Sequence, residues 1–315
     1  MILILAVIVL NFLLIHLAPG DPVETIAGEM GGASQELMDE IRKAYGLDKP
    51  LSEQLFTYIK KTAHGDLGYS YYFDRPVLEL IGQRVPATLI LVLCSLFLAM
   101  FLGTFMGVVA SYKPNGFFSH FLTMFALIGY SVPVFWLGIM MLIVFASALP
   151  MFPVSGMYDV KLASDGAGSV VHFLDILYHL ILPMVTLAII YIAQYSRLAR
   201  ASMVDVLGSD YIRTAKAKGL SKPVIFFKHA LRNAVLPVVT MAGLQMGYLF
   251  SGAVLVETVF NWPGLGRLAF QSILRRDYPT ILGILIFSTF MVIAANLLTD
   301  LSYRLIDPRI RDTAN

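Results

Sequence analysis

The sequence predicts an all-α integral membrane protein with six transmembrane helices and a helical segment outside the membrane after the first of them. Of the 315 residues, 57% are hydrophobic and 14% are charged, and the mean hydropathy is +0.74. A soluble domain typically has about a quarter of charged residues. Six charge-free runs are long enough to cross about 30 Å of hydrocarbon as helices. They are residues 1–20, 85–112, 114–158, 176–196, 233–256 and 278–299.

Charged residues and prolines set the boundaries of the predicted elements. The run over 114–158 opens with Pro114 and closes with Pro150 and Pro153, so we expect one helix within it, kinked at Pro133. In chain order the prediction is a span over 1–18, an outer segment over 19–86, spans over 87–111, 120–149 and 176–196, a cytoplasmic loop over 197–233, a span over 234–256, an outer loop over 257–278, a span over 279–300 and a cytoplasmic tail over 301–315.

The first span is predicted to be a retained helix and not a cleaved signal peptide. It lacks a basic n-region, and no A-x-A cleavage site precedes Pro19. Because no basic residue anchors its inner end, we also expect the natural start to lie further upstream. Pro19 and Pro22 should end this helix at the outer surface. In the outer segment, residues 35–63 should be helical, with Ser34 and Ser52 as candidate N-caps.

The distribution of Lys and Arg predicts that both termini are cytoplasmic. With the N-terminus inside, the inner segments 112–119, 197–232 and 302–315 hold 12 basic residues, whereas the short outer loops hold 4. Basic residues are enriched in short cytoplasmic loops, and long translocated segments such as 19–86 escape this rule.

The residue types missing from the spans exclude several ways of powering transport. The apolar runs contain no carboxylate or basic side chain, and their notable polar residues are Gln194, Gln245 and Asn296. Ion-coupled carriers usually place ionisable residues at membrane depth. The chain has no G-x4-G-K-[ST] phosphate loop, only one cysteine (Cys94) and no metal-ligand spacing among its histidines. We therefore expect no enzyme activity and no cofactor in this chain, and energy from a separate subunit.

A basic loop between the fourth and fifth spans is the candidate contact for that subunit. It carries eight Lys or Arg from Arg197 to Arg232. Ser209 is a plausible N-cap for a short helix over about 210–218, and Gly219 suits the left-handed position after it.

A second helix of the loop should begin at Ser221, accept Pro223 in its first turn and end near Asn233. The small side chains of Ala215 and Ala217 would allow another surface to approach closely. The alternative is a loop that only fixes topology and touches lipid headgroups.

The segment Arg213-Thr214-Ala215-Lys216-Ala217-Lys218-Gly219 resembles the E-A-A-x-x-x-G loop of ABC importer permeases, which docks on the nucleotide-binding subunit. Arg213 and Thr214 depart from that pattern. The departures resemble the dipeptide, oligopeptide and nickel branch, whose loop reads much like Asp210 to Gly219 followed by His229 to Pro237.

Further segments resemble the same branch in its order, and together they point to the first of its two permease subunits, with a permease core over about 84–300. They are His16–Pro22, Gly65–Ser70, Arg84–Thr88, Ser131–Trp136, Glu257–Gly266, Arg276–Pro279 and Asp307–Arg309.

The resemblance implies a multi-pass subunit of the cell inner membrane that imports dipeptides or oligopeptides. Nickel chelates and glutathione are the alternative substrates within the same type of complex. The implied partners are a second homologous permease, two cytoplasmic ATP-binding subunits and a periplasmic substrate-binding protein. Membrane lipid should surround the chain, and no nucleic acid partner is expected.

The candidate site residues form two groups. Those expected to couple the chain to the ATPase are Asp210, Arg213, Thr214, Ala215, Ala217 and Gly219. Those expected to line the substrate path are Ser131, Trp136, Gln245 and Asn296.

Two functions of other classes can be stated. Gly129-Tyr130-Ser131 in one span and His179 in the next faintly resemble the serine and histidine of an intramembrane protease, but Val132 leaves a G-x-S-G motif incomplete. Ser131 is better explained as a small residue at a helix contact. An uncoupled channel is the other candidate, and rapid passive flux without any partner would support it.

Overall fold

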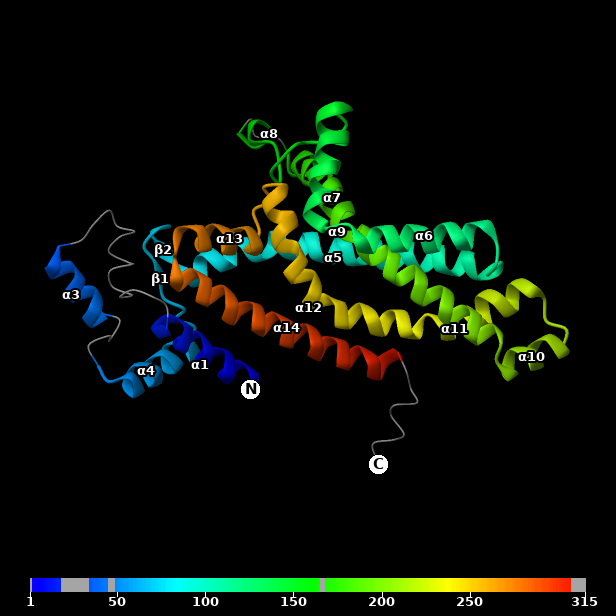
Figure 1. The fold of residues 1–315 in the computed structure, drawn as a ribbon, viewed down its shortest axis with the longest axis horizontal. Coiled ribbons are helices and arrows are strands. Elements are labelled where there is room, and N and C mark those ends of the chain that lie inside the picture. The colour runs from blue at the N-terminus through cyan, green and yellow to red at the C-terminus, as the bar shows by residue number, and fades with distance from the viewer. Residues whose placement is uncertain (1, 18–33, 45–48, 165–167, 307–315) are drawn as a thin grey trace. The chain divides into compact units, whose positions relative to one another are not determined.

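The computed structural model describes residues 2–17, 34–44, 49–164 and 168–306, and almost all of them are helical (Figure 1). Within these ranges the β-structure is one antiparallel hairpin of β1 (Tyr69–Ser70) and β2 (Arg75–Pro76), in which Tyr69 pairs with Pro76. The predicted all-α class is therefore confirmed. Pro19 and Pro22, which are predicted to end the first helix, lie outside the described residues.

The chain forms two compact units. The first consists of Met1–Ala87 and Pro263–Ile293, and the second of Thr88–Trp262 and Ala294–Asn315. Two long helices, α5 (Val77–Tyr112) and α14 (Tyr278–Ile306), begin in the first unit and end in the second. The basic loop over 197–233 lies wholly within the second unit.

The first unit contains, besides the hairpin and the first part of α5, the helices α1 (Ile2–Leu17), α3 (Gln35–Ala44), α4 (Leu51–Ala63) and α13 (Leu265–Arg275). Its apolar core joins α5, α13 and α14 through Val77, Leu80, Ile81, Leu265, Leu268 and Ile284. A buried carboxylate ties the hairpin to α14. The Ser70 hydroxyl donates to Asp277 Oδ2 at 2.6 Å, and Asp277 Oδ1 accepts from the Thr280 N–H at 3.3 Å.

The helical prediction for residues 35–63 agrees with α3 and α4, but the two candidate caps differ in outcome. Ser34 directly precedes α3, and its carbonyl accepts from the Met38 N–H at 3.0 Å. Ser52 lies inside α4, whose N-cap position is occupied by Pro50, so its assignment as a cap is wrong. Pro50 has no side-chain acceptor, and its carbonyl accepts from the Glu53 N–H at 2.9 Å and from the Gln54 N–H at 3.1 Å.

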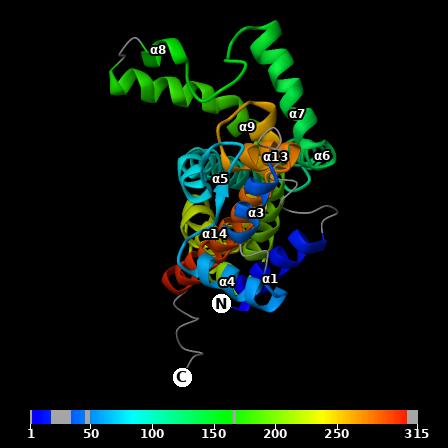
Figure 2. The same cartoon turned by 90° about the vertical axis from the view of Figure 1, so that its left-hand side faces the viewer.

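The second unit is built around α9 (Ser169–Leu207), a helix of 39 residues. Besides α5, the elements that pack against it include α6 (Phe117–Ser131), α7 (Val134–Met141), η2 (Val224–Ala230), α11 (Leu231–Ala234) and α12 (Leu236–Val259). The short helix α8 (Val160–Ser164) lies beside the first turns of α9 (Figure 2). α10 (Asp210–Ala217) follows its other end (Figure 1).

Two glycines allow α5 to approach α9 closely. A Cβ atom at Gly103 would lie 2.6 Å from Tyr195 Cβ and 2.8 Å from the Ile192 carbonyl oxygen, and one at Gly107 would overlap the Ser196 carbonyl oxygen. Small residues four positions apart are typical of helix contacts in membranes. This Gly-x3-Gly pattern is legible in the sequence and identifies the face of α5 that packs on α9.

The stretch predicted as one kinked helix over 120–149 is instead divided. α6 ends at Ser131, Val132 and Pro133 are extended with ψ of 126° and 135°, and α7 begins at Val134. A π-helical segment, η1 (Leu142–Ala148), follows α7. Proline disfavours the helical conformation of the residue before it, and at Val132 this breaks the helix where we expected a bend.

Four described helical stretches are long and apolar enough to cross a membrane, namely Val77–Tyr112, Ser169–Leu207, Val224–Gly243 and Tyr278–Leu297. The first and third predicted spans fall on shorter apolar helices. α9 extends beyond the predicted span of 176–196 on both sides and measures about 58 Å at 1.5 Å per residue. Charge-free runs locate only the apolar part of a helix. The backbone hydrogen bonds of the helix continue into the charged residues on either side of that run.

Candidate functional site

The basic loop forms the short helix α10, and its end has the predicted geometry. Gly219 has φ of +74°, in the left-handed region. Its N–H donates to the Lys216 carbonyl at 3.0 Å, and the Leu220 N–H donates to the Ala215 carbonyl at 3.4 Å. These two bonds are the pair that defines a Schellman motif. The sequence-based prediction of a left-handed glycine at this position is confirmed.

Ser209 occupies the position before α10 but does not cap it with its side chain. Its hydroxyl donates to the Val206 carbonyl at 2.6 Å, near the end of α9, and forms no capping bond with α10. Ser209 therefore occupies the predicted N-cap position, but the predicted capping hydrogen bond from its side chain is not formed. A serine hydroxyl can satisfy a free carbonyl at a preceding helix end as readily as a free N–H ahead of it.

One face of α10 is buried within the chain. Ile212 is fully buried and Ala215 is 7% exposed. Both belong to an apolar cluster with α5, α9, η2 and α11, formed by Val108, Met203, Ile212, Ala215, Ile225, Ala230 and Ala234. Ala215 therefore packs against its own chain, and the expectation that it meets another surface directly is corrected. Its small side chain instead lets α10 lie close to the helices beneath it.

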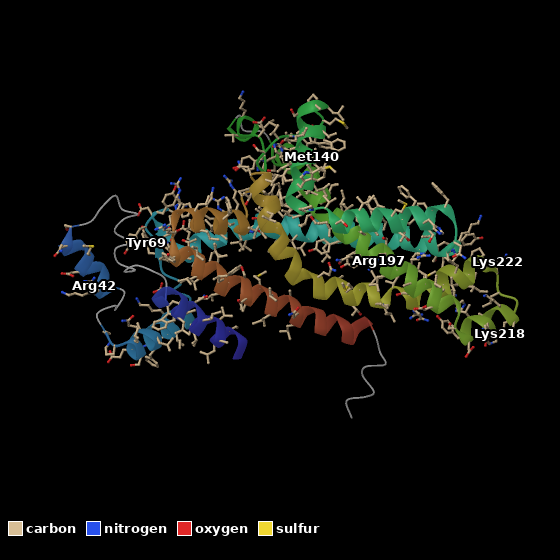
Figure 3. All side chains as sticks on the ribbon, in the orientation of Figure 1. Arg42, Tyr69, Met140, Arg197, Lys218 and Lys222 are labelled. Carbon is tan, nitrogen blue, oxygen red and sulfur yellow. The ribbon has the colours of Figure 1, made fainter. Side chains whose placement is uncertain are left out.

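The opposite face of α10 is polar and exposed. The side chains of Asp210 and Arg213 are 94% and 75% exposed, and they form an ion pair of 3.2 Å. Such an exposed pair contributes little to stability. Thr214, Ala217 and Gly219 are also exposed. Lys218 and Lys222 lie at the same end of the second unit (Figure 3). We call the exposed residues Asp210, Arg213, Thr214 and Ala217 the outer face of α10.

Tyr211 connects α10 to the segments that follow it. The Asn233 side-chain N–H donates to Tyr211 Oη at 2.7 Å, and Tyr211 Oη donates to the His229 carbonyl at 3.4 Å.

The second predicted helix of the loop does not end near Asn233. Val235 keeps a helical conformation, with φ −77° and ψ −21°, and the chain continues into α12 because Pro237 falls in the first turn, where proline is tolerated.

The four residues predicted to line a substrate path do not converge on one cavity. Ser131 ends α6, Trp136 lies on α7 and is 48% exposed, and Asn296 is exposed on α14. Gln245, on α12, is 3% exposed. Its Nε2 donates to Gln194 Oε1 on α9. The two glutamines thereby form a polar contact between neighbouring helices, which apolar runs alone did not predict.

A buried carboxylate was also missed. Glu257 was assigned to the outer loop over 257–278, but it lies on α12 and is fully buried. The Thr88 hydroxyl donates to Glu257 Oε1 at 2.6 Å. A buried carboxylate requires such hydrogen bonds to offset its lost hydration. The signal in the sequence was only that Glu257 immediately follows an apolar run, which also describes any charged residue at a membrane surface.

The described part of the chain contains no cluster of three or more His, Cys, Asp or Glu suited to a metal ion. His179 Nδ1 lies 3.2 Å from Asp175 Oδ1 on its own helix, so it faces a carboxylate one turn before it.

Comparison with known proteins gives consistent matches along the chain. Residues 99–312 match the family described as "Binding-protein-dependent transport system inner membrane component", and residues 1–92 match its N-terminal counterpart. The chain is 41% identical to the dipeptide transport system permease protein DppB of Escherichia coli (strain K12), over 98% of this chain and 94% of that protein. It is 42% identical to the di/tripeptide transport system permease protein DppB of Pseudomonas aeruginosa (strain UCBPP-PA14), over 97% and 94%.

Among solved structures, the fold is similar to that of the MetNI methionine ABC transporter in an inward-facing conformation. The TM-score is 0.56, and the match covers 73% of this chain and 97% of that chain at 17% identity. At this identity the match supports the fold alone.

The left-handed conformation of Gly219 makes a testable prediction. A Cβ at Gly219 would meet no atom within 4 Å, so Gly219→Val acts only through backbone strain, about 1–2 kcal/mol. Gly219→Asn should be tolerated, because Asn adopts this conformation readily. We expect trypsin to cleave the purified Val variant after Lys218 or Lys222 roughly tenfold faster than the parent chain.

Gly208 provides the control, since its φ of −82° is accessible to any residue. Asn and Val at position 208 should therefore give equal cleavage rates. Equal rates for Asn and Val at position 219 would show that the loop does not depend on this turn.

Proposed function

This chain belongs to the family of binding-protein-dependent transport system inner membrane components, and on that premise we propose that it is one permease subunit of an ATP-driven importer of short peptides. The observation that carries the substrate class is the near full-length identity of 41% and 42% to two permeases named for dipeptides and for di- and tripeptides. Nickel chelates and glutathione remain the alternative cargoes for a complex of the same type.

We assign the outer face of α10 to contact with a cytoplasmic ATPase subunit. Asp210, Arg213, Thr214 and Ala217 would touch that subunit, because all four are exposed. Ala215 and Gly219 would act indirectly, by seating the helix and by turning the chain after it. The proposed complex further contains a second permease, a second ATPase subunit and a periplasmic substrate-binding protein. In this assignment ATP binds to the partner subunits.

The packing of α10 suggests how its motion would open and close a path. α10 is buried on α5 and α9 through Ile212 and Ala215, and Tyr211 ties it to η2 and α11. Closure of the ATPase subunits would therefore move these helices together. Interfaces of this kind switch between discrete packings, because packed helices do not deform continuously. ATP binding would thus bias the permease between outward and inward openings.

For topology we propose six spans with both termini in the cytoplasm. The support is the excess of basic residues in the inner loops, 12 against 4, and the four long apolar helices. α1 and the divided pair α6 and α7 would complete the six. The segment over 19–86 would then be periplasmic, where it could meet the binding protein. An intramembrane protease is not favoured, because Val132 follows Ser131 and leaves the G-x-S-G motif incomplete.

The topology is tested by fusing reporters that are active only outside the cytoplasm. A fusion at residue 60 should be active, whereas fusions at residue 215 and after Asn315 should be inactive. Activity at residue 215 would place α10 outside the cytoplasm and remove it from any ATPase.

The function is tested by uptake into vesicles that contain the complete transporter with its ATPase subunits and ATP inside and its binding protein added outside. We expect dipeptide accumulation that requires ATP, and competition from tripeptides but not from glutathione or a nickel chelate. This chain alone should neither hydrolyse ATP nor accumulate peptide. Accumulation of a nickel chelate in preference to peptides would reassign the cargo, and passive flux through the chain alone would indicate a channel.

A further inference from the structure

A cavity of about 620 Å³ lies between helices of the second unit. Ala126 on α6 and Met241 on α12 form two of its walls. The other lining residues all come from α9, and they are Ala193, Gln194, Arg197, Leu198 and Ala201. The three alanines keep the space open. Small-molecule sites in proteins commonly measure about 300–1,000 Å³.

The polar groups of this cavity are donors. Arg197 follows Gln194 by three positions, so both side chains stand on the same face of α9. Gln194 Oε1 already accepts a hydrogen bond from Gln245 Nε2. The Gln194 group that remains for another partner is therefore its amide N–H donor. No carboxylate is among the lining residues. A cavity that offers only donors is matched by a ligand that offers acceptors.

Arg197 differs from the other arginine near it. Arg200, one turn further along α9, donates to the Pro114 carbonyl at 2.8 Å and so holds the loop between α5 and α6. Arg197 is exposed and forms no ion pair with any described residue. It lies on α9 between Met140 on α7 and Lys218 and Lys222 beyond α10 (Figure 3). Arg197 therefore brings to the cavity an exposed guanidinium that no described carboxylate neutralises.

The glutamine pair carries a cost of its own. Gln245 is 3% exposed, and its Oε1 has no hydrogen-bond partner among the described residues. A buried acceptor left unpaired loses its hydration without a compensating hydrogen bond. An apolar residue at position 245 would avoid that cost, so the pair points to a task beyond packing. Its effect is to fix the orientation of the Gln194 amide.

We propose that Arg197 and Gln194 bind the C-terminal carboxylate of a peptide on its way through the transporter, with Gln245 as a positioning residue. This inference rests on the proposed peptide import. Arginine suits the ligand because its planar fork matches a carboxylate with two parallel hydrogen bonds.

Recognition of the C-terminal carboxylate alone would not discriminate between peptides with different side chains. The remaining walls are apolar and include Met241, whose flexible thioether adapts to varied shapes. The exposure of Arg197 keeps the contact weak, which allows the peptide to leave. A path that must pass many peptides needs both properties.

The test uses the complete transporter in nanodiscs of zwitterionic phosphatidylcholine, without nucleotide or binding protein. The probes are radiolabelled alanyl-alanine and its C-terminal amide, which lacks the carboxylate. We expect Arg197→Gln to weaken alanyl-alanine binding about tenfold, which corresponds to about 1.4 kcal/mol. Binding of the amide should be equally weak in the parent and in the variant. Arg197→Lys should restore part of the affinity for alanyl-alanine.

Two further variants complete the design. Lys113→Gln removes an exposed positive charge from the loop between α5 and α6 and should leave both affinities unchanged. Gln245→Leu should weaken alanyl-alanine binding less than Arg197→Gln does. ATP hydrolysis by each complex shows that the variants are folded and assembled.

The proposal is overturned if Arg197→Gln leaves alanyl-alanine binding unchanged, or if it weakens acid and amide alike, which would assign Arg197 to lipid headgroups or to assembly. An absence of alanyl-alanine binding by the parent complex at concentrations that saturate uptake also overturns it. The proposed function fails on a different result, namely the absence of ATP-dependent peptide uptake by the parent complex.

Discussion

The proposed coupling depends on one interaction, the packing of the buried face of α10 against the rest of the second unit. Ile212 and Ala215 pack into the apolar cluster with Val108 and Met203, and full burial of a side chain such as Ile212 contributes about 1.5–3 kcal/mol. That packing fixes which face of α10 is left outside. It also joins a short polar helix to α5 and α9, so that a force applied to the loop reaches helices that enter the membrane.

Polar contacts within the helix assembly give it specific geometry. The Gln194–Gln245 pair joins α9 to α12, and the Thr88 hydroxyl donates to Glu257 near the C-terminal end of α12. Lipid offers no alternative hydrogen bonds, so such pairs favour particular helix partners. The Gly-x3-Gly face of α5 then sets the distance to α9. Small shifts between these packed helices would change the shape of the cavity beside Arg197.

Much of this structure could be predicted from the sequence, and the errors have local causes. Gly219 was predictable because a left-handed turn after a basic last helical turn favours glycine strongly. The burial of Ala215 was not, because composition does not show which face of a short helix is covered; the clue was Ile212, three positions earlier. Two predictions based on proline were wrong. One helix breaks at Pro133, where we expected a bend, and another continues through Pro237, where we expected it to have ended. Pairings between distant segments, such as Thr88 with Glu257, require tertiary structure.

The contact between the outer face of α10 and an ATPase subunit is tested most directly by cross-linking. Cys94 is the sole cysteine, so a Cys94→Ser chain accepts single cysteines elsewhere. With a short thiol-to-amine reagent on the assembled transporter, Ala217→Cys should link to an ATPase subunit, and Ala215→Cys, which is buried, should not. Cross-linking from position 217 only to lipid or to nothing, or equal linking from both positions, would contradict the account.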